Sequence, residues 1–227
     1  VEPAHRERCV YIPENGVDAE RFSLAVGGPV RSPLRVAFLG RLVPYKGADM
    51  LLEAAAPLVR EGRLVVDLIG DGPDLPRLHD QIAALEIGKG VRCEGAVDHA
   101  RLQHRLVESD VFAFPSIREF GGGAVLEAMA LGLVPVVVDY GGPSELVTEG
   151  TGYRIPLGSR GEIVARLRGH LEALTRDPSR IREIGGRARR RVQERFTWEA
   201  KAAQTRQVYD WALGRCPKPD FGMPLPD

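Results

Sequence analysis

The strongest constraint on the fold is a series of short apolar segments in which nearly every position is apolar. They are rich in Val, Ile, Leu and Phe and have the length of single strands. Apolar runs of this kind, without alternation, are typical of parallel strands that are buried on both faces of a sheet. The predicted strands are Cys9–Ile12, Leu34–Leu39, Leu64–Ile69, Val91–Cys93, Val111–Phe114 and Val134–Val138.

Helix-like stretches separate these strands: Ala48–Val59, Leu75–Leu85, Ala100–Val107 and Gly123–Leu131. The alternation predicts right-handed crossovers and an open parallel α/β sheet with helices on both faces. After Gly152 the pattern changes to consecutive helices, followed by a Pro-rich tail. We predict a linker or first strand over 1–15, a sheet domain over 16–195, and a C-terminal helix with the tail over 196–227.

Composition excludes little. Lys plus Arg and Asp plus Glu both number 31, so net charge gives no reason to expect nucleic acid. The three cysteines are isolated and odd in number, which argues against a disulfide framework or a zinc site. No apolar run reaches the ~20 residues of a membrane span, and Val1–Arg8 does not resemble a signal peptide. We therefore predict a cytoplasmic location; the missing initial Met suggests a fragment.

The segment 160–195 contains eleven arginines. Such a stripe could bind acidic lipid headgroups at a membrane surface. Acidic residues interleave with the arginines, however, which favours a solvated helical face. A weak peripheral contact with a membrane stays as the alternative.

Two glutamates, Glu119 and Glu127, bracket a glycine-rich loop that follows a predicted strand and opens a predicted helix. Such a loop directs free backbone N–H groups and the positive end of the helix dipole at an anion such as phosphate. Carboxylates beside it can accept hydrogen bonds from sugar hydroxyls. The glycines Gly121, Gly122 and Gly123 are entropically costly, so a simple flexible turn is a less comfortable explanation. A nucleotide sugar suits this arrangement.

Two cations, Arg41 and Lys46, lie on the loop after the strand Leu34–Leu39, and the helix after Gly47 adds further free N–H groups. Arg binds phosphate bidentately, while Lys acts as a mobile point charge. They are either solvated loop cations or a diphosphate site that needs no metal. Because loops after parallel strands meet at one edge, we favour the site. Motifs for metal hydrolysis, P-loop phosphoryl transfer and dehydrogenases are absent from the sequence.

At this point the sequence resembles the C-terminal half of family 4 retaining glycosyltransferases, which have the two-lobed GT-B fold with Rossmann-like lobes. Nearly the whole chain carries the resemblance. The matching motifs include Ile12–Asp18 with Arg21-Phe22, Gly40–Leu42 with Lys46-Gly47, Ile69–Pro73, Pro115-Ser116, Glu119–Ala130, and Gly141-Gly142 before Glu145–Val147.

The resemblance implies a retaining transfer of sugar from a UDP-, GDP- or ADP-sugar, without a metal or other cofactor. Arg41 and Lys46 match the diphosphate-binding pair, and Glu119 matches the residue that faces the donor sugar; these are the predicted catalytic residues. Glu127 matches the ribose-binding glutamate. The glycines Gly121 to Gly123 and Leu126 would also contact the donor, and Val97 would lie near the base.

Two departures concern the linker and the sugar pocket: Glu14 interrupts the usual Pro-Asn-Gly run, and Phe120 follows Glu119 directly, one position early. The family also has an N-terminal lobe that carries the acceptor site, and we expect none of these 227 residues to form it. We therefore predict that the chain alone binds donor but transfers sugar poorly, and that Trp198, Tyr209 and Trp211 are exposed. The alternatives are another GT-B enzyme, such as an epimerase or a phosphorylase, and a non-catalytic nucleotide-sugar-binding or partner-binding module.

Overall fold

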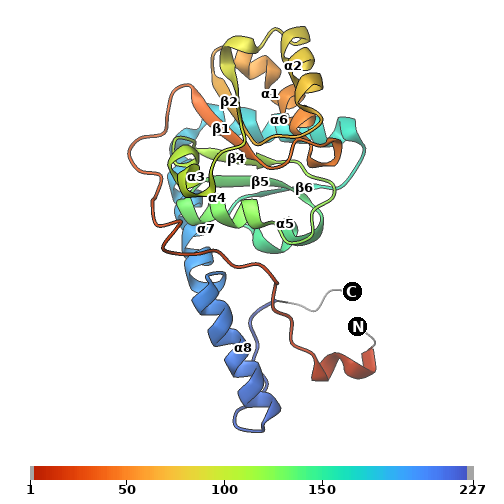
Figure 1. Cartoon of the computed structure of the whole chain (residues 1–227), viewed down its shortest axis with the longest axis vertical. Coiled ribbons are helices and arrows are strands. Elements are labelled where there is room, and N and C mark those ends of the chain that lie inside the picture. Colours follow the sequence, from red (N-terminus) through yellow and green to blue (C-terminus); the bar gives the residue numbers. More distant parts are fainter. Residues whose placement is uncertain (1–2, 224–227) are drawn as a thin grey trace.

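Five of the six apolar segments lie in strands of one parallel sheet in the computed structural model, which describes residues 3–223 (Figure 1). The order of the six strands is β3-β2-β1-β4-β5-β6, and every neighbouring pair is parallel. This confirms the predicted open α/β sheet. The strands are β1 (Leu34–Leu39), β2 (Leu64–Ile69), β3 (Val91–Gly95), β4 (Val111–Phe114), β5 (Val134–Asp139) and β6 (Tyr153–Pro156).

Burial explains why the inner strands could be predicted from the sequence. All residues of β4 are buried, and β1, β2 and β5 are buried at most positions, whereas the edge strands β3 and β6 are largely accessible. In the centre, the ring of Phe114 packs against those of Phe38 and Phe112, with centroids 5.7 and 5.8 Å away. A sheet with both faces covered needs apolar side chains at successive positions.

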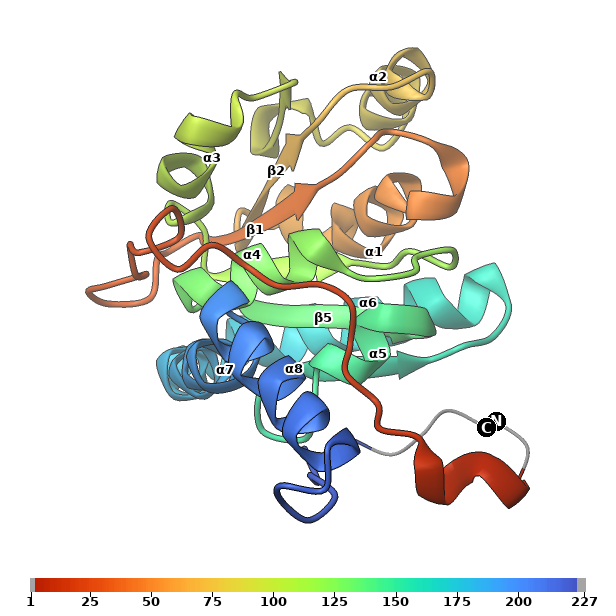
Figure 2. The ribbon, with the colours of Figure 1, turned by 60° about the horizontal axis from the view of Figure 1, so that its bottom comes forward.

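Helices cover both faces of the sheet (Figure 2). Helix α1 (Ala48–Arg60) contacts α2 (Leu75–Ala84) and α6 (Arg160–Arg176) on one face. On the other face, α4 (Gly123–Leu131) contacts α3 (His99–Leu106), α5 (Gly141–Leu146) and α7 (Ile181–Arg195). Short 3₁₀ helices occur at η1 (Pro3–Arg8), η2 (Pro44–Lys46), η3 (Gly88–Gly90) and η4 (Pro178–Arg180).

The strand order reverses between β1 and β4, which lie side by side at the centre. From β1 the chain winds outward through β2 to β3, and from β4 it winds the other way to β5 and β6. At the C-terminal edge the chain therefore leaves β1 and β4 toward helices on opposite faces of the sheet, α1 and α4. Ligands of open α/β sheets bind at this point.

One sequence prediction about the elements is wrong, and two elements were missed. Cys9–Ile12, predicted as a strand, is irregular chain, because it bonds elsewhere than to a sheet edge: the Tyr11 hydroxyl donates to Glu145 and the Cys9 N–H to the Arg6 carbonyl. The edge strand β6 and the short helix α5 were not predicted. Only Ile155 of β6 is buried, and α5 begins Gly-Gly-Pro, so neither has a periodic apolar signal.

The final helix α8 (Trp198–Ala212) projects away from the sheet layers (Figure 1). Lys201 is its one buried residue within the described chain. Trp198 and Tyr209 are exposed as predicted, whereas Trp211 is partly covered and the Lys218 ammonium lies 5.7 Å from its ring centroid. At its base, the N–H of Val17 donates to the Phe196 carbonyl (2.8 Å) and that of Trp198 to the Val17 carbonyl (3.2 Å).

The arginines of 160–195 mostly hold the fold together. Six of them donate to backbone carbonyls of other segments, and Arg182 also binds the buried Asp110 carboxylate at 2.7 Å. The predicted solvated face therefore describes only part of this stripe. In the described residues no helix has the length and apolarity needed to span a bilayer. The domain divisions stay predictions, and residues 224–227 of the Pro-rich tail, like 1–2 of the linker, lie outside the described residues.

Candidate functional site

The loops after β1 and β4 are bonded directly to each other at the C-terminal edge of the sheet. The Tyr45 carbonyl accepts from the Ile117 N–H (3.0 Å) and from the Ser116 hydroxyl (3.2 Å). Ser116 is fully buried, so its hydroxyl needs these partners. The bonds fix the spacing between the cationic loop and the glycine loop.

Lys46 and Glu119, predicted together from these loops, form an ion pair. Both side chains are mostly withdrawn from water. The other oxygen of Glu119, Oε1, accepts from the Gly122 N–H at 3.2 Å. The cation, the acid and the start of α4 thus form one cluster, and the Lys46 charge is neutralised within the chain itself.

The three consecutive glycines have different roles. Gly122 is the N-cap of α4 and has φ of +71°, a conformation that L side chains rarely adopt. At Gly121 a methyl group would overlap with the Asn15 amide, so the N-terminal segment lies directly over this loop. Gly123 begins the helix. In the described chain no group accepts a hydrogen bond from the N–H of Gly123 or Ala124, which leaves an anion-binding helix start.

Glu127, on the second turn of α4, is held by a chain of side chains. Its Oε1 lies 3.0 Å from His99 Nε2, and His99 Nδ1 lies 2.9 Å from an Arg21 guanidinium nitrogen. Burial raises the pKa of Glu127 above its ordinary value, and the hydrogen bond from His99 partly opposes this shift. The acid therefore lies in a partly desolvated position at the nucleoside end predicted for the site.

The side chains of the other residues predicted for the site make no hydrogen bond or ion pair with the cluster of Lys46, Glu119 and the start of α4 in the described chain. Arg41 follows β1 at the same edge; it is exposed, and in the described chain its side chain makes no hydrogen bond or ion pair. Val97 lies in the loop before α3, two residues from His99. Leu126 is fully buried, and its N–H bonds to the Gly122 carbonyl (3.1 Å). Neither its side chain nor its N–H is therefore free to make the predicted contact with the sugar donor.

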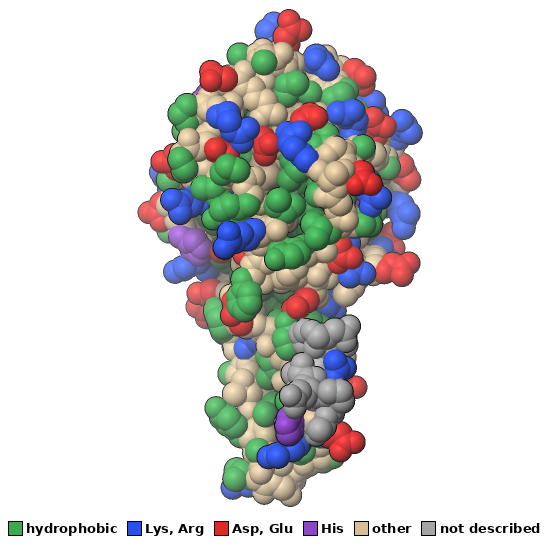
Figure 3. All heavy atoms as spheres, turned by 90° about the vertical axis from the view of Figure 1, so that its right-hand side faces the viewer, with side chains coloured by type: hydrophobic (Ala, Val, Ile, Leu, Met, Phe, Trp, Pro, Cys, Tyr) green, Lys and Arg blue, Asp and Glu red, His purple; other side chains and the backbone are tan. Residues whose placement is uncertain are grey.

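Exposed hydrophobic side chains gather at this edge, which faces the viewer in Figure 3. Five of the eight large exposed hydrophobics of the described chain follow the ends of β1, β4, β5 and β6: Tyr45, Ile117, Phe120, Tyr140 and Leu157. A shallow cavity of about 400 Å³ lies among Tyr45, Phe120 and Tyr140, with Lys46 and Glu119 in its wall. Phe120, 81% exposed, forms its rim rather than a closed pocket wall.

Sequence reasoning missed the residues that reach the site from distant segments. His99 had no predicted role, although the loop just before it was expected to approach the base. Arg21 and Asn15 belong to the quoted motifs but had no role. His99 is 28 positions from Glu127 and 78 from Arg21, so these contacts follow from the topology of the fold. In the sequence, only its closeness to Val97 could have indicated that His99 belongs to the site.

Together, the doubly wound sheet and this edge define an α/β domain whose candidate site, with a free helix start and two acids, lies at the switch point. The family model described as glycosyl transferases group 1 matches residues 24–188, and the chain belongs to this family. It is 32% identical over 227 residues to the alpha-maltose-1-phosphate synthase of Mycolicibacterium smegmatis, covering 91% of this chain and 58% of that protein. The chain thus spans little more than half the length of this relative.

Solved structures show the same architecture. Sucrose-phosphate synthase from Thermosynechococcus elongatus superposes with a TM-score of 0.74 at 24% identity, covering 95% of this chain and 57% of that one. HepE from Anabaena, in complex with UDP and glucose, gives 0.74 at 22% identity, covering 88% and 57%. These likenesses confirm the C-terminal Rossmann-like domain of a GT-B fold.

Proposed function

We propose that this chain is the donor-binding lobe of a retaining family 4 glycosyltransferase. It binds a nucleoside-diphosphate sugar at the C-terminal edge of the sheet, and its enzyme transfers the sugar to an acceptor. The observation that carries the proposal is the cluster of Lys46, Glu119 and the open start of α4 at the switch point. A cation, an acid and free N–H groups are the partners that a diphosphate joined to a sugar requires.

Each group has a separate task in this proposal. Arg41 and Lys46 stabilise the negative charge that develops on the leaving diphosphate, together with the N–H groups at the start of α4. Glu119 faces the donor sugar, and Glu127 accepts hydrogen bonds from the ribose hydroxyls. Because Lys46 is paired with Glu119 in the free chain, donor binding replaces part of this ion pair with contacts to phosphate. The preformed cluster supplies charge stabilisation without a metal.

The acceptor is proposed to bind outside this chain. The chain covers 58% of its maltose-1-phosphate synthase relative, so an enzyme of that length would have room for a second lobe. We therefore expect the chain alone to bind donor and to transfer sugar very slowly. Steady transfer to an added acceptor at the rate of a complete enzyme would contradict this expectation.

Calorimetric titration of the chain with UDP, GDP, ADP and their sugars tests donor binding. UDP is the first probe, because the similar HepE structure contains it. One diphosphate is expected to bind, and Arg41→Ala to weaken it at least about tenfold, since an exposed guanidinium bound to phosphate contributes a charge-assisted hydrogen bond of about 1.5–3 kcal/mol. Glu127→Ala is expected to lose a similar amount for each ribose hydrogen bond.

Arg206→Ala is the matched control for Arg41, because Arg206 is also an exposed arginine whose side chain has no hydrogen bond or ion pair in the described residues. It lies on α8, away from the site, and should leave affinity unchanged. If no nucleotide binds the folded chain, the partner-binding module is the better explanation. If a diphosphate binds but Glu127→Ala has no effect, the ribose role of Glu127 is wrong.

A further inference from the structure

Glu127 is reached by a relay of two side chains from other parts of the fold. His99, the first residue of α3, lies between Glu127 on α4 and Arg21 on the N-terminal segment, at 3.0 and 2.9 Å. The buried Phe22 contacts the imidazole edge-on, with ring centroids 5.7 Å apart. Two segments distant in sequence, the N-terminal segment and α4, thus fix the imidazole ring of α3.

The arrangement determines which imidazole nitrogen carries the proton. A guanidinium has only donor N–H groups and stays protonated in proteins, so His99 Nδ1, which faces Arg21, must accept. A neutral imidazole with an accepting Nδ1 carries its proton on Nε2. His99 therefore donates from Nε2 to Glu127 Oε1.

The hydrogen bond from His99 matters because the Glu127 carboxylate is largely shielded from solvent. Its side chain is 19% exposed, and in the described chain no hydrogen bond is made to its Oε2. A desolvated carboxylate resists ionisation unless a donor supports its charge. His99 supplies that donor to one oxygen and leaves the other open, while its own ring is half exposed beside the Val97 loop.

We propose that Arg21 and His99 are positioning residues for the nucleoside: Arg21 fixes the imidazole tautomer, and His99 holds Glu127 with Oε2 directed to a vicinal diol. The inference rests on the proposed function and names the ribose as the ligand group that this relay serves. Neither residue is catalytic. A purely structural role, joining α3 to α4, would affect every ligand of the site equally.

The test compares UDP, GDP and ADP with their 2′,3′-dideoxy forms, because only the ribose forms offer hydroxyls to Glu127. The wild-type chain is expected to prefer the ribose form by at least about tenfold, as expected for one charge-assisted hydrogen bond. His99→Ala should reduce this preference to within about threefold, and Arg21→Ala should reduce it partly. His99→Gln, which keeps a side-chain N–H donor, should retain most of it.

His104→Ala is the control, since His104 is an exposed histidine on the same helix with no polar partner in the described chain. If His99→Ala weakens ribose and dideoxy forms equally, or leaves the preference intact, the relay does not serve the ribose. Arg21→Ala gives the same comparison should His99→Ala fail to fold, because it is also expected to reduce the preference. If the wild-type chain binds no nucleotide, the proposed function itself fails and the relay role falls with it.

Discussion

At the scale of single residues, the buried acid Asp110 shows how this fold uses charge. It lies just before β4 and is inaccessible to solvent. Its carboxylate accepts hydrogen bonds from the guanidinium groups of Arg31 (3.0 Å) and Arg182 (2.7 Å) and from the backbone N–H of Arg35 (3.3 Å). Arg31 precedes β1 and Arg182 lies on α7. One carboxylate therefore joins the start of the sheet to the helical layer.

Asp110→Ala is expected to destabilise the chain by about 3–5 kcal/mol, because it leaves two guanidinium groups without their shared buried partner. Urea unfolding followed by circular dichroism measures the change. Asp210→Ala is the control: Asp210 pairs with Arg215 at an exposed position of α8, where loss of the pair should cost less than about 1 kcal/mol. Equal costs at the two positions would show that the network around Asp110 adds nothing.

The candidate site was predictable from sequence where its residues form local motifs. Glu119 and Gly122 lie three residues apart in one loop, and Lys46 follows a strand that any parallel arrangement would place at the same edge. Two contacts could not be predicted from the sequence: the ion pair of Lys46 with Glu119 and the hydrogen bond of His99 with Glu127. Side-chain rotamers and the hydrogen bonds between loops determine both.

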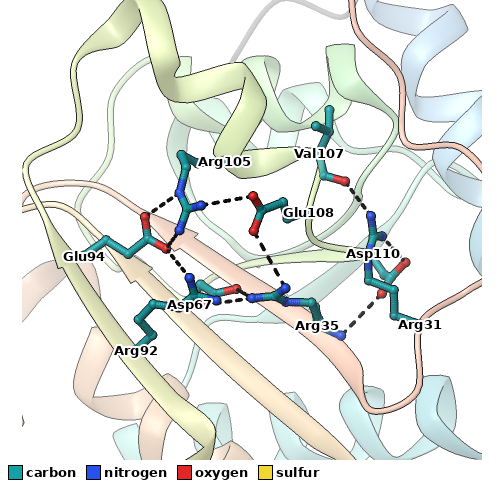
Figure 4. Close-up of polar contacts among 9 residues, drawn as sticks. All are labelled: Arg31, Arg35, Asp67, Arg92, Glu94, Arg105, Val107, Glu108 and Asp110. Atoms are coloured by element: carbon teal, nitrogen blue, oxygen red, sulfur yellow. Dashed lines mark hydrogen bonds and ion pairs between the residues drawn. The ribbon is translucent and has the colours of Figure 1, made fainter.

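At the scale of elements, α3 is attached to the sheet by charge as much as by apolar packing. Only Leu102 and Leu106 of this helix are buried. Beside them, three arginines and three acids alternate in a closed ring (Figure 4). Its members, in order, are Arg35, Asp67, Arg92, Glu94, Arg105 and Glu108. Arg105 of α3 binds Glu94 of β3 through both oxygens.

This ring predicts that α3, which carries His99, loosens when its charges are removed. Arg105 holds the pKa of Glu94 below its ordinary 4.5, so this contribution to stability is complete above that pH and is lost as the pH falls below it. Glu94→Gln should raise the rate of amide exchange in α3 by about 5- to 150-fold, as expected for about 1–3 kcal/mol. Hydrogen-exchange mass spectrometry measures this.

Helix α1 is the internal control for this experiment, because most of its residues are buried against the sheet and α6. Its exchange should not change in Glu94→Gln, nor in about 1 M salt, where charges are screened beyond about 3 Å. Equal loosening of both helices would mean that Glu94 supports the whole fold rather than α3.

Secondary-structure elements also differed in how far the sequence predicted them. The buried strands and long helices were predictable, whereas β6 and α5 depend on tertiary contacts.

At the scale of the whole molecule, the N-terminal segment joins the projecting α8 to the candidate site. The Lys201 ammonium donates to the Pro13 carbonyl at 2.6 Å, and the indole of Trp198 packs against Gly16. Next in the segment, Asn15 contacts the glycine loop at Gly121. A displacement of α8 would therefore reach the loop that begins α4.

Lys201 allows this connection to be tested through pH. It is 7% exposed, lies 4.9 Å from the Phe196 ring centroid, and burial lowers its pKa to about 8. An unfolded lysine has a pKa of about 10.4, so between these values the unfolded chain binds the extra proton and rising pH favours folding. Below about pH 8 both states are protonated, and the cost of burying the charge is fully present.

Relative to Lys201→Met, the free energy of unfolding of the wild-type chain should therefore increase by on the order of 2–3 kcal/mol between about pH 8 and pH 10.4. The two proteins share every other titrating group, including Tyr11, whose pKa burial and Glu145 raise, so their difference isolates Lys201. Urea unfolding across this range measures it, with Lys89→Met, at an exposed lysine, as the control that should follow the wild-type slope. Parallel curves for the wild type and Lys201→Met would show that Lys201 is solvated, and that the N-terminal segment is not held to α8 by a buried charge.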